Sequence, residues 1–310
     1  SKKLVGQPLL KQIIKMLPKD EFDLLVAKCG SDRYYKTFFS WEQLVVMLFG
    51  IFSRCDSMGE VCDGMRALGG KLNYLGMDVA PAKSTAGDAL RDRDEELFRL
   101  YYFSLIAYFR PLLSVSRKKD VSFEEFYAFD STTVSLFSQV MKGVGRNPKG
   151  DGKKKGGLKV HMLTDVHTET AIFAKISEAK MHDKKFLAHL KPGKGSMLVF
   201  DKAYNYYLQF AEWTLEGVNF VCRLKDNAKA QVQEVLFERR LSKEEFGVYR
   251  VEHIHLEYKE DKRIKTLCLR LVHYKDEKNR RYKFITNNWE ITPEEVALIY
   301  KYRWTIELTF

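Results

Sequence analysis

The chain has 310 residues, enough for two or three structural units, and its 45% of hydrophobic residues allow a large buried core. Lysine and arginine total 52 against 41 acidic residues, and the net charge of +11 favours a polyanion such as nucleic acid as partner. The longest apolar stretch, Leu44 to Phe52, is too short to span a bilayer, and no secretory segment opens the chain. Five scattered cysteines, without zinc-finger spacing, indicate reduced thiols and a cytoplasmic protein.

The first 115 residues or so are predicted to be helical. Apolar residues recur at helical spacing between Leu9 and Leu25, and a dense apolar run begins at Trp41. A further helix, rich in aromatic residues, is expected from Asp94 to Tyr108. Five or six helices are too many for one helix-turn-helix unit, so we expect a helical domain over residues 1–118.

Strands begin near Phe123 and alternate with helices up to residue 224. The period-two and buried apolar patterns predict strands over Phe126 to Asp130, Thr132 to Phe137, Leu158 to Thr164, Ala171 to Ile176, Met197 to Phe200 and Asn219 to Leu224. Helices are expected over Lys184 to Leu190 and Tyr206 to Glu216. We assign residues 119–224 to the first part of an α/β domain.

A charged, strand-rich segment follows over residues 225–288. Its predicted strands are Val248 to Tyr258, Arg263 to Tyr274 and Tyr282 to Thr286, and we interpret it as a β-rich insertion. The last segment, residues 289–310, begins a helix at Thr292, where a capping box with proline is found. No stop signal follows before Phe310, so we expect a fragment that ends within this helix.

Three acids have positions that suggest a shared site. Asp130 and Asp201 each directly follow an apolar strand, and Glu307 lies on the final helix. If the two strands are neighbours, both aspartates emerge at one edge of the sheet, where the helix can add its glutamate. Converging carboxylates repel one another unless cations neutralise them, and their oxygens suit Mg²⁺ or Mn²⁺. Two such ions can activate a water or a 3′-hydroxyl and stabilise the leaving oxygen at phosphorus.

Each of these acids also has an ordinary structural explanation. An aspartate at a strand end is most often a turn or cap residue, and a glutamate on an amphipathic helix is most often a solvated surface residue. The context favours the site, because Glu307 shares a helix face with Tyr300 and Arg303. Ile299 and Ile306, about 100° round this helix, should face the core instead.

Several motifs resemble those of one known protein family. Tyr300, Arg303 and Glu307 fit the signature of Tyr, two residues, Arg, three residues and Glu, whose later lysine would fall beyond Phe310. The segments Phe129-Asp-Ser-Thr-Thr-Val134 and Val199-Phe-Asp-Lys-Ala-Tyr204 resemble its two aspartate motifs. On these residues the chain resembles the DDE transposases of insertion-sequence family four. It departs from them at Lys202-Ala203, where the family more often has Arg-Gly.

The resemblance implies a fold, a site and partners. It implies a ribonuclease H-like mixed sheet with flanking helices, a β-rich insertion and an all-α N-terminal domain that binds DNA ends. Asp130, Asp201 and Glu307 would be the catalytic residues and would bind two Mg²⁺ or Mn²⁺ ions. The partners would be double-stranded DNA, as terminal inverted repeats and target, and a second copy of the protein in a homodimer. The protein would be associated with the bacterial nucleoid in the cytoplasm and have no membrane partner.

Further residues are candidates for contacts to DNA or for support of the site. Arg303, with its bidentate guanidinium, and the aromatic Tyr300 and Trp304 suit DNA ends, although helix packing is the alternative. Lys153, Lys154 and Lys155 lie in a Gly-rich loop that either grips phosphates or is only solvated. His182 and Asp183 follow a strand and are auxiliary candidates near the acids. His161 is more consistent with a structural histidine, and Asp165 with a turn residue.

Three functions remain in competition at this point. The first is a metal-dependent transposase that cleaves and transfers strands at insertion-sequence ends. The second is a catalytically inactive DNA-binding derivative, which the intact set of three acids disfavours. The third is a ribonuclease H-like nuclease, which would need neither the helical domain nor the β-rich insertion.

Overall fold

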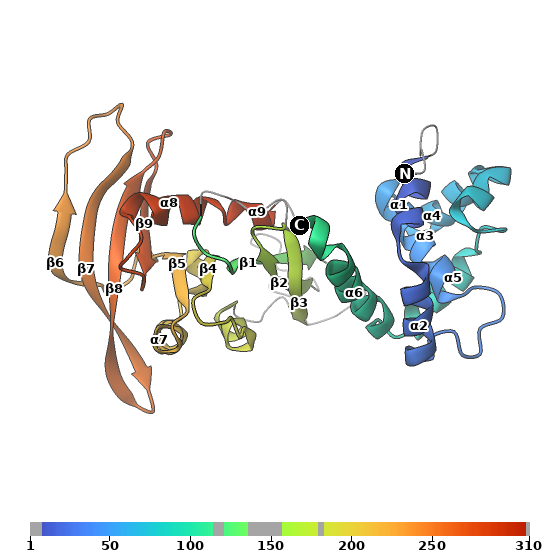
Figure 1. The fold of residues 1–310 in the computed structure, drawn as a ribbon, viewed down its shortest axis with the longest axis horizontal. Helices are drawn as coiled ribbons and strands as arrows, with labels where there is room; N and C mark the ends of the chain where they lie inside the picture. Colours follow the sequence, from blue (N-terminus) through green and yellow to red (C-terminus); the bar gives the residue numbers. More distant parts are fainter. Residues whose placement is uncertain (1–7, 114–120, 136–156, 179–182, 308–310) are drawn as a thin grey trace, which may run out of the picture. The chain divides into compact units, whose positions relative to one another are not determined.

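The computed structural model describes residues 8–113, 121–135, 157–178 and 183–307 (Figure 1). The chain divides into two compact units, Ser1–Leu112 and Leu113–Phe310. Within the described ranges, every helix is too short or too polar to cross a bilayer.

The first unit is helical, as the sequence predicts. Its helices are α1 (Leu9–Met16), α2 (Lys19–Cys29), α3 (Ser40–Phe52), α4 (Met58–Ala67), α5 (Lys83–Asp92) and α6 (Glu96–Leu113), with the 3-10 helix η1 (Gly69–Leu75) between α4 and α5. Val45 and Val46 from the apolar run of α3 are buried in its core. The buried Arg93 guanidinium donates to Gln43 Oε1 at 2.7 Å and to the Phe38 carbonyl, which ties the end of α5 to α3.

The second unit is built on one mixed sheet. Among the described residues the strand order is β3-β2-β1-β4-β5-β9-β8-β7-β6. The strands are β1 (Phe126–Ser135), β2 (Gly157–Asp165), β3 (Thr170–Glu178), β4 (Met197–Phe200), β5 (Asn219–Arg223), β6 (Gln231–Glu238), β7 (Gly247–Glu260), β8 (Arg263–Lys275) and β9 (Arg281–Thr286). Only the β1–β4 and β4–β5 pairs are parallel.

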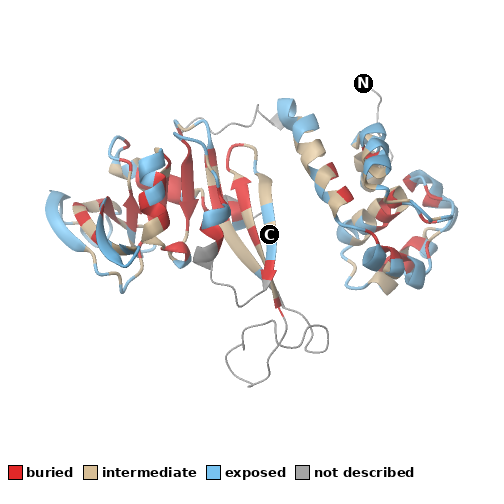
Figure 2. Ribbon diagram, turned by 90° about the horizontal axis from the view of Figure 1, so that it is seen from below, coloured by how far each residue is buried: buried red, intermediate tan, exposed pale blue. Residues whose placement is uncertain are grey.

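Both faces of this sheet are covered in its middle. Alternate residues of β1 and β4, such as Phe129 and Phe200, pack with α7 (Tyr207–Glu216) on one face. The intervening residues, such as Ala128 and Val199, pack with α8 (Pro293–Lys301) on the other. Buried residues are concentrated in these central strands (Figure 2). The fold class is therefore the predicted one, a mixed α/β sheet with flanking helices of the ribonuclease H-like kind beside a helical N-terminal region.

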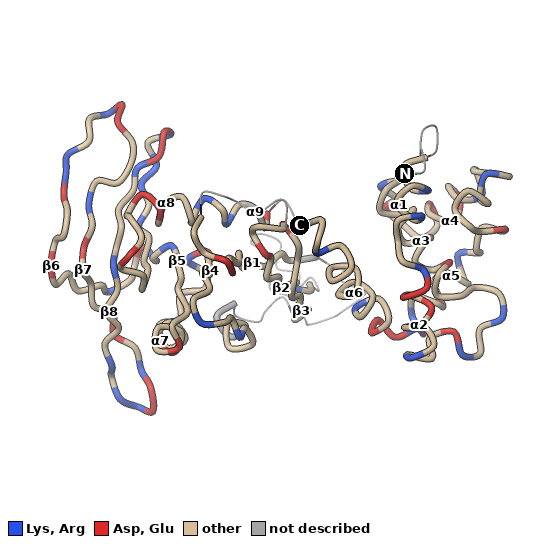
Figure 3. The backbone as a smooth tube through the Cα atoms, in the orientation of Figure 1, with Lys and Arg blue, Asp and Glu red and all other residues tan. Residues whose placement is uncertain are grey.

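The segment predicted as an insertion extends this same sheet. β9 pairs antiparallel with β5, so β6 to β9 continue the core strands rather than forming a separate layer. The sequence predicts β7, β8 and β9 but not β6. All residues of β6 (Gln231–Glu238) are exposed, so the segment lacks the regular apolar and polar alternation of a half-buried strand. Basic and acidic residues are interspersed along these outer strands (Figure 3).

Three predicted elements differ from the structure. The two extended pieces around Asp130 are one strand, because β2 pairs with β1 along its whole length. The helix predicted over Lys184 to Leu190 is present as the 3-10 helix η3 (Asp183–His189), shifted by one residue. The final helix is interrupted after Lys301, where i to i+3 hydrogen bonds tighten the chain before α9 (Trp304–Glu307).

Candidate active site

Two aspartates occupy equivalent places on neighbouring parallel strands. The last parallel pair of β1 and β4 joins Phe129 to Phe200. Asp130 is the next residue of β1, and Asp201 directly follows the end of β4. Neighbouring strands lie about 4.8 Å apart. Side chains alternate along a strand, so both carboxylates leave the sheet on the face that α8 covers. The sheet alone therefore brings the two acids together.

The final helical segment completes the cluster from above that face. The Tyr300 hydroxyl donates to Asp201 Oδ1 at 2.9 Å. Arg303 donates from Nη1 to Asp130 Oδ2 at 3.0 Å and from Nη2 to Glu307 Oε1 at 2.7 Å. We call these five residues the acid edge. One guanidinium thus connects the acid on β1 to the acid on α9, while the tyrosine holds the acid that follows β4.

The helix faces are divided much as predicted. Ile299 and Ile306 are buried in the core cluster beneath α8. Tyr300 and Arg303 point toward the aspartates, but they are themselves buried, with exposed fractions of 6% and 8%. The acid edge is therefore a partly desolvated site, in which Glu307 is the most open carboxylate with 43% of its side chain exposed.

Burial and like charge both act on Asp130. Desolvation is the largest cause that raises the pKa of its carboxyl, and the charges of Asp201 and Glu307 raise it further. The backbone N–H of Ser131 and the guanidinium of Arg303 act in the opposite direction. Since the net shift is upward, the hydrogen bond from Ser131 and the charge of Arg303 do not offset the cost of burying this carboxylate. A further cation would favour the ionised form of Asp130.

The two residues that hold the acids keep their protons. Burial, followed by the nearby charge of Asp201, raises the pKa of Tyr300 well above its usual range. Burial disfavours the charged form of Arg303, but the hydrogen bond and charge of Glu307, with further interactions, raise its pKa overall. Tyr300 is therefore a permanent hydrogen-bond donor to Asp201, and Arg303 is a permanent cation between two carboxylates.

Comparison with known proteins identifies the family. Residues 121–310 match the transposase DDE domain, which covers more than half of the chain. The chain belongs to the transposase DDE domain family. Residues 5–78 match a domain of unknown function, DUF4372. A curated protein of Sinorhizobium fredii, named "Putative transposase y4zB", is 26% identical over 165 residues. That match covers 52% of this chain and 45% of the relative, so the chain spans less than half of the relative's length.

The acid edge has the donor chemistry of a DDE site. Members of the family generally use divalent metal ions, and carboxylate oxygens are the ligands that Mg²⁺ and Mn²⁺ prefer. A bound cation would favour the ionised form of the Asp130 carboxyl, whose pKa burial raises. Among the described residues, however, the ligand atoms of the three acids do not all lie within 4.8 Å of one another. Arg303 lies between Asp130 and Glu307, so closer convergence of the acids requires its guanidinium to shift.

Sequence patterns missed the residues that fix the loop after Asp201. The Asn205 amide donates to Cys222 Sγ and to the Arg223 carbonyl, and its Oδ1 accepts from the Lys225 backbone at 3.1 Å. The Cys222 thiol in turn donates to the Asp201 carbonyl at 3.5 Å. These contacts anchor both ends of the turn to β5. Their only sequence signal is an asparagine four residues after the aspartate.

Lys202, which stands where the family motif more often has arginine, has an ion-pair partner close by. Lys202 lies in the short 3-10 helix η4 (Lys202–Tyr204) that follows Asp201. Its ammonium group forms an ion pair with Asp226 at 2.9 Å, and the Asp226 side chain is 79% exposed. The lysine therefore contacts an acid beyond β5 rather than the acid edge.

Two alternative candidates have structural roles, as predicted. The ring of His161 is buried, stacks on Phe186 at 4.5 Å between centroids, and shares a hydrogen bond of 3.0 Å with the Ser177 hydroxyl. Asp165 accepts from the backbone of His167 and Thr168 in the turn between β2 and β3.

The remaining candidates are divided between exposed and undescribed positions. Trp304 is 53% exposed, and the Arg303 guanidinium lies 5.7 Å from its ring centroid. Lys153, Lys154, Lys155 and His182 lie outside the described residues. The backbone of Asp183 begins η3, but the position of its side chain is likewise outside the described part.

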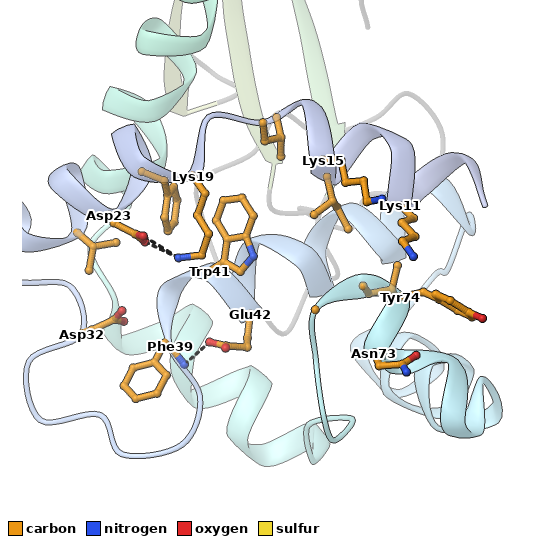
Figure 4. A pocket seen from close by; sticks show the side chains of 16 residues that line it. Lys11, Lys15, Lys19, Asp23, Asp32, Phe39, Trp41, Glu42, Asn73 and Tyr74 are labelled. Carbon is orange, nitrogen blue, oxygen red and sulfur yellow. Dashed lines mark hydrogen bonds and ion pairs between the residues drawn. The ribbon is translucent and has the colours of Figure 1, made fainter. Parts of the chain in front are cut away.

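A second candidate region lies within the first unit. A pocket of about 670 Å³, which we call the N-terminal groove, is lined by residues of α1, α2, α3 and η1 (Figure 4). At one end Lys11 and Lys15 extend from one face of α1, and the Lys11 ammonium lies 4.3 Å from the Tyr74 ring centroid. At the other end Lys19 is paired with Asp23 at 2.7 Å. Two basic side chains therefore line the α1 end of the N-terminal groove.

Proposed function

We propose that this protein is a transposase that catalyses metal-dependent cleavage and strand transfer of DNA at the ends of an insertion sequence. The observation that carries the proposal is the register of β1 and β4. It gives Asp130 and Asp201 equivalent places beside Arg303 and Glu307. Membership of the DDE transposase family supports the same function. The spacing of Tyr300, Arg303 and Glu307 supports assignment to insertion-sequence family four.

The three acids would bind the metal ions, and Tyr300 and Arg303 would position the acids. Asp130, Asp201 and Glu307 would hold two Mg²⁺ or Mn²⁺ ions, which supply activation of a water or 3′-hydroxyl and stabilisation of the leaving oxygen. Tyr300 fixes one oxygen of Asp201 and leaves the other available as a ligand. Before ions bind, Arg303 reduces the electrostatic repulsion between Asp130 and Glu307. Its guanidinium also has the geometry to bind a DNA phosphate in place of the two acids.

Contacts with DNA would come from both units. Exposed Trp304 offers an aromatic face beside Arg303 on which a base can stack. Lys11 and Lys15 of the N-terminal groove offer charge for phosphates of the end sequence. Lys153, Lys154 and Lys155 would contact phosphates near the acid edge, with His182 and Asp183 as auxiliary residues. We propose double-stranded DNA as the substrate, a homodimer as the active form and association with the bacterial nucleoid in the cytoplasm.

The test is cleavage of labelled insertion-sequence ends. The purified protein is incubated with a duplex that carries the inverted repeat flanking its gene, with Mg²⁺, Mn²⁺ or EDTA. We expect cleavage at the repeat only with a divalent ion, and none from Asp201→Asn. Binding without cleavage under all conditions would indicate the DNA-binding derivative. Cleavage of RNA–DNA hybrids regardless of sequence would indicate a nuclease.

A further inference from the structure

A second group of metal-binding side chains lies far out along the sheet. His253 and His255 are two residues apart on β7 and so share a face, and His255 is paired with Cys268 on β8. One ligand atom from each residue lies within 4.8 Å of the others. Within the described ranges, no other three His, Cys, Asp or Glu side chains come as close together. The group combines two imidazoles with one thiol and contains no carboxylate.

One imidazole nitrogen of this group lacks a hydrogen-bond partner. His253 Nε2 is buried and forms no hydrogen bond in the described structure. A buried imidazole nitrogen without a partner is costly, and an unpaired polar atom of this kind is often explained by an ion. The ring itself is held at right angles to two neighbours, His255 at 5.2 Å and Trp289 at 5.4 Å between centroids. Its orientation is therefore fixed by packing rather than by a hydrogen bond from Nε2.

We propose that His253, His255 and Cys268 bind a Zn²⁺ ion. Imidazole nitrogen and thiolate sulfur are the ligands that zinc prefers, whereas Mg²⁺ prefers the oxygens of the acid edge. Bonds of about 2.0 Å to nitrogen and 2.3 Å to sulfur place tetrahedral ligands about 3.5 Å apart. The observed separations, all within 4.8 Å, need to contract by at most about 1.3 Å to reach this geometry.

A fourth ligand is available from the neighbouring strand. Glu234 on β6 is paired with His253 and therefore lies on the same face of the sheet. The residue is exposed, so its carboxylate is able to change rotamer and complete a tetrahedral site. A water molecule is the other possible fourth ligand for a three-residue zinc site.

The position of the group gives the ion a structural role. The last pair between β8 and β9 joins Arg270 to Thr286, so beyond it toward residue 263 the strand β8 has only β7 as a partner. Figure 1 shows the β7–β8 hairpin projecting past β9 at this point. Cys268 is two residues beyond that last pair. A zinc ion would cross-link β7 and β8 at the base of the hairpin, where β8 no longer pairs with β9.

The test uses Co²⁺ as a spectroscopic substitute for Zn²⁺ in untagged protein. We expect about one Co²⁺ per chain, with tetrahedral d–d absorption and a thiolate-to-cobalt charge-transfer band, which Zn²⁺ then displaces. Cys268→Ser should abolish the charge-transfer band. This cysteine is exposed, so the substitution is not expected to unfold the protein. Cys55→Ser is the matched control and should leave the band intact. His255→Ala should weaken Co²⁺ binding at least about tenfold.

A second measurement separates this site from the acid edge. Addition of Zn²⁺ should raise the Tm of the wild-type protein and of Asp201→Asn equally, and should not raise that of Cys268→Ser. The proposal is overturned if the wild-type protein shows no charge-transfer band, or if Cys268→Ser retains it. Because Asp201→Asn tests DNA cleavage and Cys268→Ser tests zinc binding, failure of either proposal leaves the other standing.

Discussion

The acid edge and the N-terminal groove hold charge in opposite ways. At the acid edge, Asp130 and Arg303 are mostly buried and are bound to each other at 3.0 Å. In the groove, Lys11 and Lys15 belong to α1, which has no buried residue among those described. Buried, mutually bound charges are suited to fixing reacting atoms, whereas exposed charges are suited to attracting phosphates. Substitutions in the two regions should therefore separate catalytic rate from DNA affinity.

The largest effect is expected from Asp130→Asn. Loss of one carboxylate from the shared cluster should reduce the rate of end cleavage at least about a thousandfold. DNA affinity should stay within about twofold, because phosphate attraction comes from Lys and Arg. The measurements are single-turnover cleavage and a filter-binding or anisotropy titration on the same duplex.

Asp165→Asn is the matched control for that substitution. Asp165 is likewise an aspartate of a core strand, at the end of β2, but its Oδ1 only accepts backbone hydrogen bonds in a turn. An asparagine side chain supplies the same acceptor, so cleavage and binding should both remain at the wild-type level. Equal losses from the two variants would refute the separate role of Asp130.

A smaller but still large effect is expected from Arg303→Ala. Its removal leaves Asp130 and Glu307 without their shared counter-charge and, under the proposed function, removes a contact to the reacting phosphate. Cleavage should fall about a hundredfold, comparable to the loss of one preorganised donor in other enzymes. Affinity for DNA without an end sequence should change little, because one buried cation adds little to the total positive charge.

Arg303→Lys sharpens this prediction. A lysine keeps the charge but loses the two-pronged geometry that reaches both acids. Cleavage by this variant should lie between that of wild type and of Arg303→Ala. If Arg303→Ala lowers cleavage and non-specific binding by the same factor, Arg303 is only one basic residue among many.

The opposite behaviour is expected from the double variant Lys11→Ala, Lys15→Ala. Loss of two phosphate contacts should weaken binding about tenfold and reduce the slope of log K against log salt by about 1.8. Cleavage at saturating DNA should be unchanged. Lys28→Ala, Lys71→Ala removes the same charge from exposed positions of the same unit that do not line the groove. An identical loss from this control pair would mean that the groove has no special part in binding.

Features that depend on residues close together in the sequence are predicted from the sequence alone. Asp130 and Asp201 each directly follow an apolar strand segment, and that pattern was sufficient to single them out. The capping box at Thr292 likewise placed the start of α8, where the Thr292 hydroxyl accepts from the Glu295 backbone at 3.2 Å. Both features depend on residues within a few positions of one another.

Features that depend on pairing between distant strands were not predicted. The contacts of Asn205 reach residues 17 to 20 positions away, and they exist only because β4 and β5 are neighbours. Cys268 meets His255 only through the register of β7 and β8, so no metal-ligand spacing is present in the sequence. The interruption near Arg303 also escaped detection, because no glycine or proline marks it and the contacts to Asp130 are tertiary.

The smallest effect is expected at Lys202, which tests where the acid edge ends. This residue directly follows Asp201, so position along the chain suggests a phosphate contact beside the reacting acids. Its ammonium group is instead paired with Asp226, whose side chain is 79% exposed, and such surface pairs contribute little. Lys202→Ala should therefore leave cleavage and DNA affinity within about twofold of wild type, with an unchanged salt slope. Lys202→Arg restores the residue more common in the family and should behave in the same way. A tenfold loss of affinity in Lys202→Ala, with a shallower salt slope, would instead show that the lysine leaves Asp226 for DNA. The boundary between the catalytic and binding regions would then have to include the turn after β4.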